Sequence, residues 1–213
     1  MKGKTEIILI GGGGHCKSVI DVIEFTELYQ IIGILDVVEK MGNVVSGYKI
    51  IGSVELIPEL LEKGSSFCIS LGQMKSSEKR VKYFELISNL GGDLPVIISP
   101  KATISKNVLI GSGTVIHHNC VLNTESIIGK NCIVNTGAVI EHESKVGNHC
   151  HVSTGAYVNG QCVIGEGVFI GSKSVVSNNV HISNNSVIGV GSVVVKSIEN
   201  TGVYFGNPAI KRD

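Results

Sequence analysis

The segment 128–152, IGKNCIVNTGAVIEHESKVGNHCHV, decides the fold of the larger part of this chain. An aliphatic residue recurs in it at every sixth position, at Ile128, Val134, Ile140, Val146 and Val152. The same spacing extends without insertion from residue 98 to residue 194, and all seventeen positions hold Ile, Leu or Val. A small or β-branched residue follows four positions later in each of the first sixteen hexads.

A period of six fits neither an α-helix nor a two-sided strand, but it fits a short strand followed by a tight turn. Gly and Asn tolerate the unusual backbone angles of such turns, and one of them follows the aliphatic residue in nine of sixteen hexads. Three such sides close a triangular coil, and coils stack about 4.8 Å apart through parallel backbone hydrogen bonds. The sequence therefore predicts a parallel β-helix over residues 96–213.

Residues 1–95 alternate between apolar strands and amphipathic helices. Strands are expected at 5–11, 29–36 and 66–72, and helices at 16–25, 53–63 and 75–91. This order predicts a small Rossmann-like parallel sheet, so the chain divides into an α/β domain (1–95) and a β-helix domain (96–213). Ligands of such sheets bind beyond the carboxyl ends of the strands. These ends carry the Gly-rich segment 11–15, Asp36 and Gly72.

The stretch GGGGHCKS, residues 11–18, resembles two phosphate-binding motifs and matches neither. Both the dinucleotide fingerprint and the P-loop require glycine where this chain has Cys16. One interpretation is a tight strand-to-helix turn without a ligand. The favoured one is that Gly13, Gly14 and His15 approach a nucleotide or sugar phosphate at the helix N-terminus.

A charged cluster interrupts the apolar repeat, because the hexad that starts at Ile140 places Glu141, His142 and Glu143 outside the coil. One interpretation is that His142 and a neighbouring carboxylate are a solvated surface pair without a catalytic role. The functional one is a general base, because a neighbouring carboxylate increases the basicity of an imidazole. His151 follows nine residues later and belongs to a different side of the prism. Two adjacent prisms could bring both rings to one atom, which predicts a homotrimer with interfacial sites.

The remaining histidines and the cysteines have simpler interpretations. His117, His118, His149 and His181 are expected on the surface. Four cysteines occupy the small inward position of the repeat and are expected to be core thiols: Cys120, Cys132, Cys150 and Cys162.

Charge and hydropathy exclude several classes of partner. The 18 basic and 18 acidic residues cancel, which gives no electrostatic reason to expect nucleic acid or an anionic membrane. No apolar run approaches the roughly 20 residues that span a bilayer. We therefore expect a cytoplasmic protein without membrane insertion.

Motifs along the whole chain resemble those of the bacterial sugar O-acyltransferase family, which contains sialic acid O-acetyltransferases and nucleotide-linked 4-amino-sugar N-acetyltransferases. They are the Gly-rich turn with His15, GILD, ISLG, the seventeen hexads, NTGAVIEHES, HVSTGAYVNG and GVYFGNPAIK. The resemblance implies a left-handed β-helix, acetyl-CoA as co-substrate, no metal and a role in polysaccharide biosynthesis. The implied reaction acetylates the amino group of a nucleotide-linked 4-amino-4,6-dideoxy sugar in a ternary complex.

The resemblance also implies site residues. His142 matches the catalytic base, and Glu143 the acid that increases its basicity. His151 matches a residue that contacts the acetyl thioester from the adjoining subunit, where it, or a backbone amide, would stabilise the oxyanion. Ser172 and Val190 match positions whose backbone holds the pantetheine arm. The nucleotide-sugar site is matched by Gly13, Gly14, His15, Asp36, Val37 and Gly72.

Three alternatives remain at this point. One is O-acetylation of sialic acid, and another is a non-catalytic scaffold that merely uses the prism. The third is a zinc hydrolyase of the carbonic anhydrase type, which also uses β-helix trimers and needs three converging histidines. That family's paired His-x4-His is absent, since no two of the seven histidines have this spacing.

Overall fold

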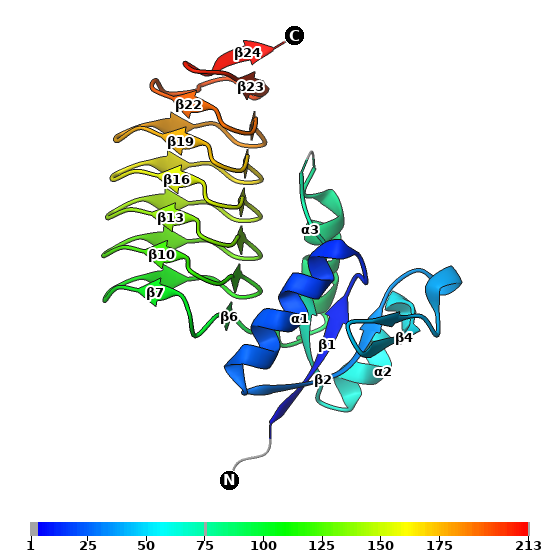
Figure 1. The fold of residues 1–213 in the computed structure, drawn as a ribbon. Coiled ribbons are helices and arrows are strands. Elements are labelled where there is room, and N and C mark those ends of the chain that lie inside the picture. The colour runs from blue at the N-terminus through cyan, green and yellow to red at the C-terminus, as the bar shows by residue number, and fades with distance from the viewer. Residues whose placement is uncertain (1–3, 75, 213) are drawn as a thin grey trace.

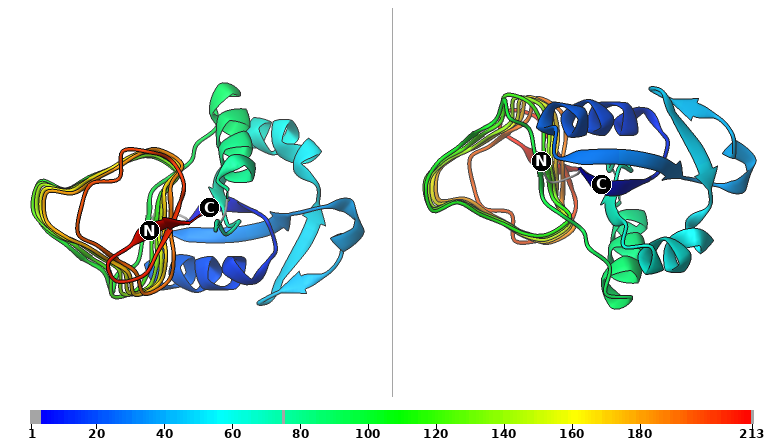
Figure 2. Two further views of the ribbon diagram at one scale, coloured as in Figure 1. Left: turned by 90° about the horizontal axis from the view of Figure 1, so that it is seen from above. Right: turned by 90° about the horizontal axis from the view of Figure 1, so that it is seen from below.

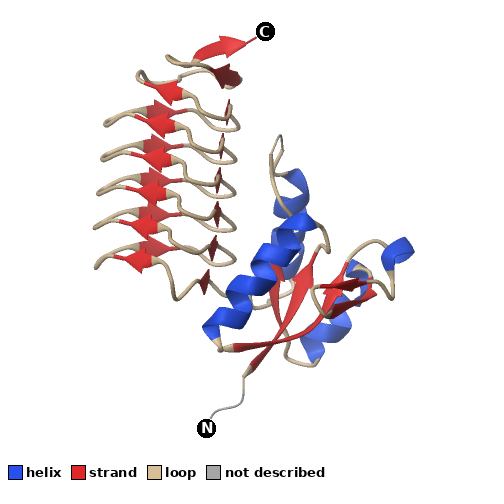
Figure 3. Ribbon diagram, viewed as in Figure 1, coloured by secondary structure: helices blue, strands red, loops and turns tan. Residues whose placement is uncertain are grey.

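The computed structural model describes residues 4–74 and 76–212. A small α/β part precedes a tall stack of short strands, which lies beside it (Figure 1). Helices occur in the first part, and the second consists of strands and turns (Figure 3). The predicted fold class, a small Rossmann-like parallel sheet followed by a β-helix, is confirmed.

The N-terminal sheet has the strand order β3-β4-β2-β1-β5. Strand β1 pairs in parallel with β2 and β5, and β2 pairs in parallel with β4. The elements are β1 (Thr5–Ile10), α1 (Gly14–Thr26), β2 (Tyr29–Leu35), β3 (Val44–Val45), β4 (Tyr48–Gly52), α2 (Ile57–Glu62), β5 (Ser66–Ile69) and α3 (Glu78–Asn89), with 3-10 turns at Val38–Lys40 and Val54–Leu56.

The sheet is covered on both faces because its central strands are apolar on both sides. Side chains of β1 alternate between the two cores: Ile7 and Leu9 pack with α1, whereas Ile8 and Ile10 pack with α2 and α3. Each expected strand and helix is present at least in part. Strand β5 ends at Ile69, earlier than its apolar run suggested, and α2 and α3 are shorter than the expected helices 53–63 and 75–91, of which residue 75 lies outside the described residues. The β3–β4 hairpin was not predicted, since its first strand has only two residues.

The β-helix has three faces, made of two-residue strands that pair in parallel one coil apart, except that the first face ends in the three-residue strands β23 and β24, which pair antiparallel with each other. We number the faces in chain order and name each corner after the face that precedes it. The first face contains β6 (Ile97–Ile98), β9 (Val115–Ile116), β12 (Ile133–Val134), β15 (His151–Val152), β18 (Phe169–Ile170), β21 (Val187–Ile188), β23 (Val203–Phe205) and β24 (Ile210–Arg212). The second contains β7 (Thr103–Ile104), β10 (Val121–Leu122), β13 (Val139–Ile140), β16 (Tyr157–Val158), β19 (Val175–Val176) and β22 (Val193–Val194). The third contains β8 (Leu109–Ile110), β11 (Ile127–Ile128), β14 (Lys145–Val146), β17 (Val163–Ile164) and β20 (His181–Ile182).

The interior of the prism follows the predicted register. The aliphatic residue of each hexad from Ile116 to Val194 is buried in one continuous core. The four predicted core cysteines lie in the same core and are free thiols. Corner residues such as Glu143 and Gln161 adopt positive φ, which is how the chain turns sharply between faces.

The α/β part packs against the first face of the prism. Ile97 and Val115 of this face belong to the same core as α1 and β1. Arg80 of α3 is fully buried and donates to Ile69 O, Leu71 O and both oxygens of Asn131. Viewed along its axis, the prism is a triangle with one corner pointing away from the α/β part (Figure 2). This is the second corner, because it lies opposite the first face.

Candidate active site

His142 and Glu143 form a hydrogen-bonded pair at the second corner, in the turn between β13 and β14. His142 Nδ1 donates to Glu143 Oε2 at 3.0 Å, so Nε2 of the neutral ring carries the lone pair. The two side chains are 46% and 48% exposed, which leaves the ring open to an incoming group. Glu143 also accepts from Gln161 Nε2 at 3.2 Å, so its carboxylate is held from the next coil.

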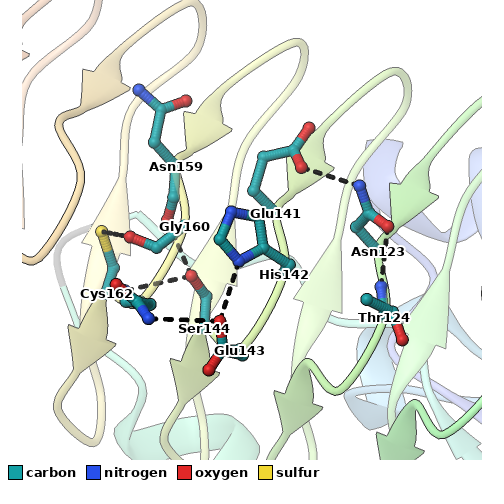
Figure 4. Close-up of polar contacts among 10 residues, drawn as sticks. Asn123, Thr124, Glu141, His142, Glu143, Ser144, Asn159, Gly160 and Cys162 are labelled. Atoms are coloured by element: carbon teal, nitrogen blue, oxygen red, sulfur yellow. Dashed lines mark hydrogen bonds and ion pairs between the residues drawn. The ribbon is translucent and has the colours of Figure 1, made fainter.

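The ring of His142 lies against Gly160, which occupies the same place one coil further on (Figure 4). A β-carbon at Gly160 would lie 2.5 Å from His142 Nε2 and 2.6 Å from Cε1. Glycine is therefore the residue that leaves room for the ring. Glu141, in contrast, turns to the preceding coil and accepts from Asn123 Nδ2 at 2.8 Å.

The strand ends of the α/β sheet surround a cavity of about 360 Å³. Asp36, Val37, Ser53, Glu55 and Tyr83 are among its lining residues. The Asp36 carboxylate accepts from Gly12 N–H, Val37 N–H and Lys40 Nζ. Burial alone would raise the pKa of Asp36, but these hydrogen bonds lower it. Asp36 thus ties the Gly-rich turn to the end of β2.

Helix α1 begins at Gly14, so the Gly13–His15 turn lies at its N-terminus as predicted. The His15 ring packs 5.2 Å from the His117 ring and 6.3 Å from the His151 ring, measured between centroids. Gly72, after β5, is close enough that a β-carbon there would touch His15 Cβ at 3.4 Å. The structure therefore brings Gly13, His15 and Gly72 together beside the prism.

Three of the four histidines expected on the surface are wholly or partly buried, because the α/β part packs against them: His117, His149 and His118, whose side chain is 16% exposed and contacts Asp21 of α1. His117 is 1% exposed rather than on the surface. Burial, and then its histidine neighbours, lowers the pKa of His117 to about 4 and that of His15 to about 3. His149 is half-buried, with its ring against Phe84, and burial lowers its pKa. Sequence periodicity could not show this, since it does not say what packs outside the coil.

His151 is also buried, at 6% exposure, on β15 of the first face. Its Nδ1 lies 2.6 Å from Gln73 O, and its Nε2 lies 3.3 Å from Asn135 Nδ2. Burial lowers the pKa of His151 to about 4, although the bond to Gln73 works in the opposite direction. Gln73 and Asn135 were not predicted as neighbours of the site, and Asn135 has no sequence signal beyond its place in the repeat.

Ser172 and Val190 lie at the first corner, one above the other, as the repeat predicted. Ser172 O accepts from Gly191 N–H, and Ser172 Oγ lies 2.9 Å from Ser153 Oγ in the coil below. Within the part of the chain that the structure describes, neither the N–H of Ser172 nor that of Val190 makes a hydrogen bond. Both backbone donors are therefore open at this corner.

Within one chain these residues form two separate groups. The first corner and the adjoining α/β part carry His15, Gly72, His151, Ser172 and Val190. His142 and Glu143 stand at the second corner, opposite the face on which the α/β part is docked. A single copy therefore does not bring His142 to the cavity of its own α/β part.

Two kinds of feature are absent from residues 4–74 and 76–212, a cluster of metal ligands and a membrane-spanning helix. No group of three or more His, Cys, Asp or Glu side chains there has a geometry that could hold a metal ion. None of the helices in these ranges is long and apolar enough to cross a membrane.

Comparison with known proteins agrees with this architecture. Residues 6–84 match the PglD N-terminal domain, and residues 92–187 match the GMPPB C-terminal domain. No curated protein matches the sequence.

Solved structures match over nearly the whole chain. The acetyltransferase domain of PglB from Neisseria gonorrhoeae, in complex with acetyl coenzyme A, is 29% identical with a TM-score of 0.92, covering 99% of this chain and 100% of that one. PerB from Caulobacter crescentus, in complex with CoA and GDP-perosamine, is 28% identical with a TM-score of 0.90, covering 100% and 99%. WeeI from Acinetobacter baumannii shares the fold at 23% identity and a TM-score of 0.84, covering 98% and 100%. Over nearly its whole length this chain is therefore similar to sugar acetyltransferases of the PglD/NeuD-like kind.

Proposed function

We propose that the protein transfers the acetyl group of acetyl-CoA to the amino group of a nucleotide-linked 4-amino-4,6-dideoxy sugar. Two structural relatives that match nearly the whole of this chain support the substrates, since one holds acetyl coenzyme A and another holds CoA with GDP-perosamine. The observation that carries the chemistry is the His142–Glu143 pair. Its open Nε2 lone pair is what a general base needs.

His142 acts on the acceptor amine in this proposal. The amine nitrogen attacks the thioester carbonyl carbon, the C–N bond forms, and the carbonyl oxygen takes up the electron pair. His142 Nε2 accepts the proton that the nitrogen loses, and Glu143 stabilises the resulting imidazolium. The tetrahedral intermediate then breaks its C–S bond, and the proton passes from His142 to the departing CoA thiolate.

The two groups of residues imply a site shared by two copies. His142 belongs to the same coil as Asn135 and precedes His151 by half a coil, so all three lie at a similar height on the prism. A groove of about 650 Å³ runs beside Glu143 along the third face, which exposes Leu109, Ile127 and Val163. These side chains are apolar and suit a contact with another copy. We infer a homotrimer in which the second corner of one copy faces the first corner of the next.

The two parts of the chain bind different substrates. Residues 1–95 bind the nucleotide sugar, with the nucleotide in the cavity beside Asp36 and Val37 and its phosphates near Gly13, Gly14, His15 and Gly72. Residues 96–213 bind acetyl-CoA along the first corner, where Ser172 and Val190 offer backbone N–H groups to the pantetheine arm. With these substrates we place the reaction in the cytoplasm, in polysaccharide biosynthesis.

Thiol release from acetyl-CoA tests the reaction, with UDP-linked and GDP-linked 4-amino-4,6-dideoxy sugars and sialic acid as acceptors. Release with a nucleotide amino sugar supports the proposal, whereas release only with sialic acid replaces it by O-acetylation. His142→Ala should lose most turnover and still bind acetyl-CoA. His181→Ala is the matched control, because His181 also pairs with an acid, Glu199, and is 45% exposed. Near-normal turnover in His142→Ala would refute the role of the base.

Mixed trimers test whether the site is shared. His142→Ala and His15→Ala should each be nearly inactive alone. In trimers assembled from equal amounts of both, about a quarter of the interfaces combine an intact His142 with an intact α/β part from the neighbour. Recovery of activity to that level supports a shared site, and mixtures as inactive as the single variants contradict it.

A further inference from the structure

A chain of three hydrogen bonds fixes the side chain of Asn135 at the first corner. Thr136 N–H donates to Asn135 Oδ1 at 2.8 Å, so this atom is the oxygen and the amide nitrogen points the other way. Asn135 Nδ2 lies 3.3 Å from His151 Nε2. His151 Nδ1 lies 2.6 Å from the backbone oxygen of Gln73.

These bonds determine which atoms of His151 carry hydrogen. The Gln73 carbonyl accepts only, so His151 Nδ1 must be the donor. Asn135 Nδ2 donates only, so His151 Nε2 must be the acceptor. The buried ring is neutral at pH 7, since its pKa is lowered to about 4. Its one N–H is therefore used by Gln73, and the expectation that His151 itself stabilises the oxyanion does not fit this arrangement.

Asn135 has an N–H donor that is available to a ligand, whereas the one N–H of His151 is already used. Its amide has two N–H bonds, one of which is used by His151. Among the described residues Nδ2 makes no second hydrogen bond, and the residue is only half-buried, so its second N–H can reach a ligand at the first corner. Ser153 and Ser172 follow on the next two coils of this corner, along the path proposed for the pantetheine arm. The thioester at the end of that arm would meet the corner at the level of Asn135 and His151.

We propose that Asn135 Nδ2 donates its free hydrogen to the carbonyl oxygen of the acetyl thioester and stabilises the oxyanion that forms there. The inference rests on the proposed function. Asn135 is the catalytic residue in this step, and His151 is a positioning residue that holds the amide while Gln73 holds His151. No proton is transferred to or from Asn135, because the oxyanion accepts a hydrogen bond and reforms the carbonyl when the C–S bond breaks.

Infrared difference spectroscopy of bound acetyl-CoA, labelled with ¹³C at the thioester carbonyl, tests this contact without an acceptor sugar. A hydrogen bond from Asn135 lowers the carbonyl stretching frequency relative to free acetyl-CoA. Asn135→Ala and Asn135→Asp should both return the band towards its free position, since neither side chain donates. Asn123→Ala is the control: Asn123 accepts from Thr124 N–H at 2.8 Å in the same local turn, but at the second corner.

Steady-state kinetics provide an independent readout. Removing one oxyanion donor lowers kcat about 10²–10³-fold, with little change in the KM for acetyl-CoA. His151→Gln should also lower kcat, and the pH profile of kcat should keep its shape because neutral His151 does not titrate during turnover. If the imidazolium of His151 were the donor, kcat would instead gain a limb that rises towards low pH and disappears in His151→Gln.

The outcomes separate this inference from the function on which it rests. A lowered carbonyl band that survives both Asn135 variants, with kcat unchanged, overturns the role of Asn135. Absence of any bound acetyl-CoA in the unmodified protein overturns the proposed function instead. A band shift and a kcat loss that occur together in both Asn135 variants, with Asn123→Ala unaffected, support the inference.

Discussion

Gly160→Ala is a direct test of how the prism positions His142. The added β-carbon would lie 2.5 Å from His142 Nε2 and 2.6 Å from Cε1, whereas unstrained contacts between such atoms are about 3.5 Å. The imidazole must therefore move by about 1 Å. A misplacement of this size costs about 10²-fold in rate.

The same geometry predicts that folding is hardly affected. Gly160 has no positive φ, so alanine fits its backbone. His142 is 46% exposed and its ring can turn outward into solvent. We therefore expect the free energy of unfolding to change by less than about 1 kcal/mol.

The measurement is kcat from thiol release, together with urea unfolding and acetyl-CoA affinity. Asn178→Ala is the control, because this exposed residue stands directly after Gly160 in the same column of the second corner. Gly160→Ala should lose turnover while retaining stability and acetyl-CoA binding. An unchanged kcat would refute the reasoning, and so would a stability loss of several kcal/mol.

Two further predictions concern stability and assembly. In the folded chain the pKa of His15 is lowered to about 3, and the pKa values of His117 and His151 are lowered to about 4. Below about pH 6.5, therefore, these histidines bind protons in the unfolded chain but not in the folded chain. These histidines therefore do not reduce the free energy of unfolding above that pH, but they reduce it progressively as the pH drops towards 4. His117→Gln should reduce the slope of the free energy of unfolding against pH, measured by urea titration, by about 1.4 kcal/mol per pH unit. An unchanged slope contradicts the lowered pKa of His117. Val163→Arg, on the exposed third face, should dissociate the trimer in sedimentation experiments and abolish turnover, and an active monomer would contradict the shared site.

The repeat made the prism predictable in detail. Each aliphatic position sets its own face, so the place of His142 outside the coil and the buried state of Cys132 follow from counting alone. The α/β part was predictable at the level of its main strands and helices, because alternating apolar runs are long enough to recognise. The β3–β4 hairpin was too short for that.

The contacts between the α/β part and the β-helix could not be predicted from the sequence. Nothing in the repeat indicates that Arg80 reaches Asn131, or that Gln73 reaches His149 and His151. These bonds join residues 51 to 78 positions apart. Docking of the α/β part buries His117, and the bond to Gln73 O settles the tautomer of His151, so the chemistry of the first corner depends on docking that periodicity does not encode.

The uninterrupted register restricts how the chain can change in length. Insertion of a single hexad before His142 would shift it by one side of the triangle, away from the second corner. Insertion of a full coil would preserve the faces, but between Asn131 and His151 it would pull apart the bonds that Arg80 and Gln73 make to the prism. We therefore expect homologous chains to differ in length by whole coils, and to place those coils after His151, where the prism grows taller while its docking bonds stay in register.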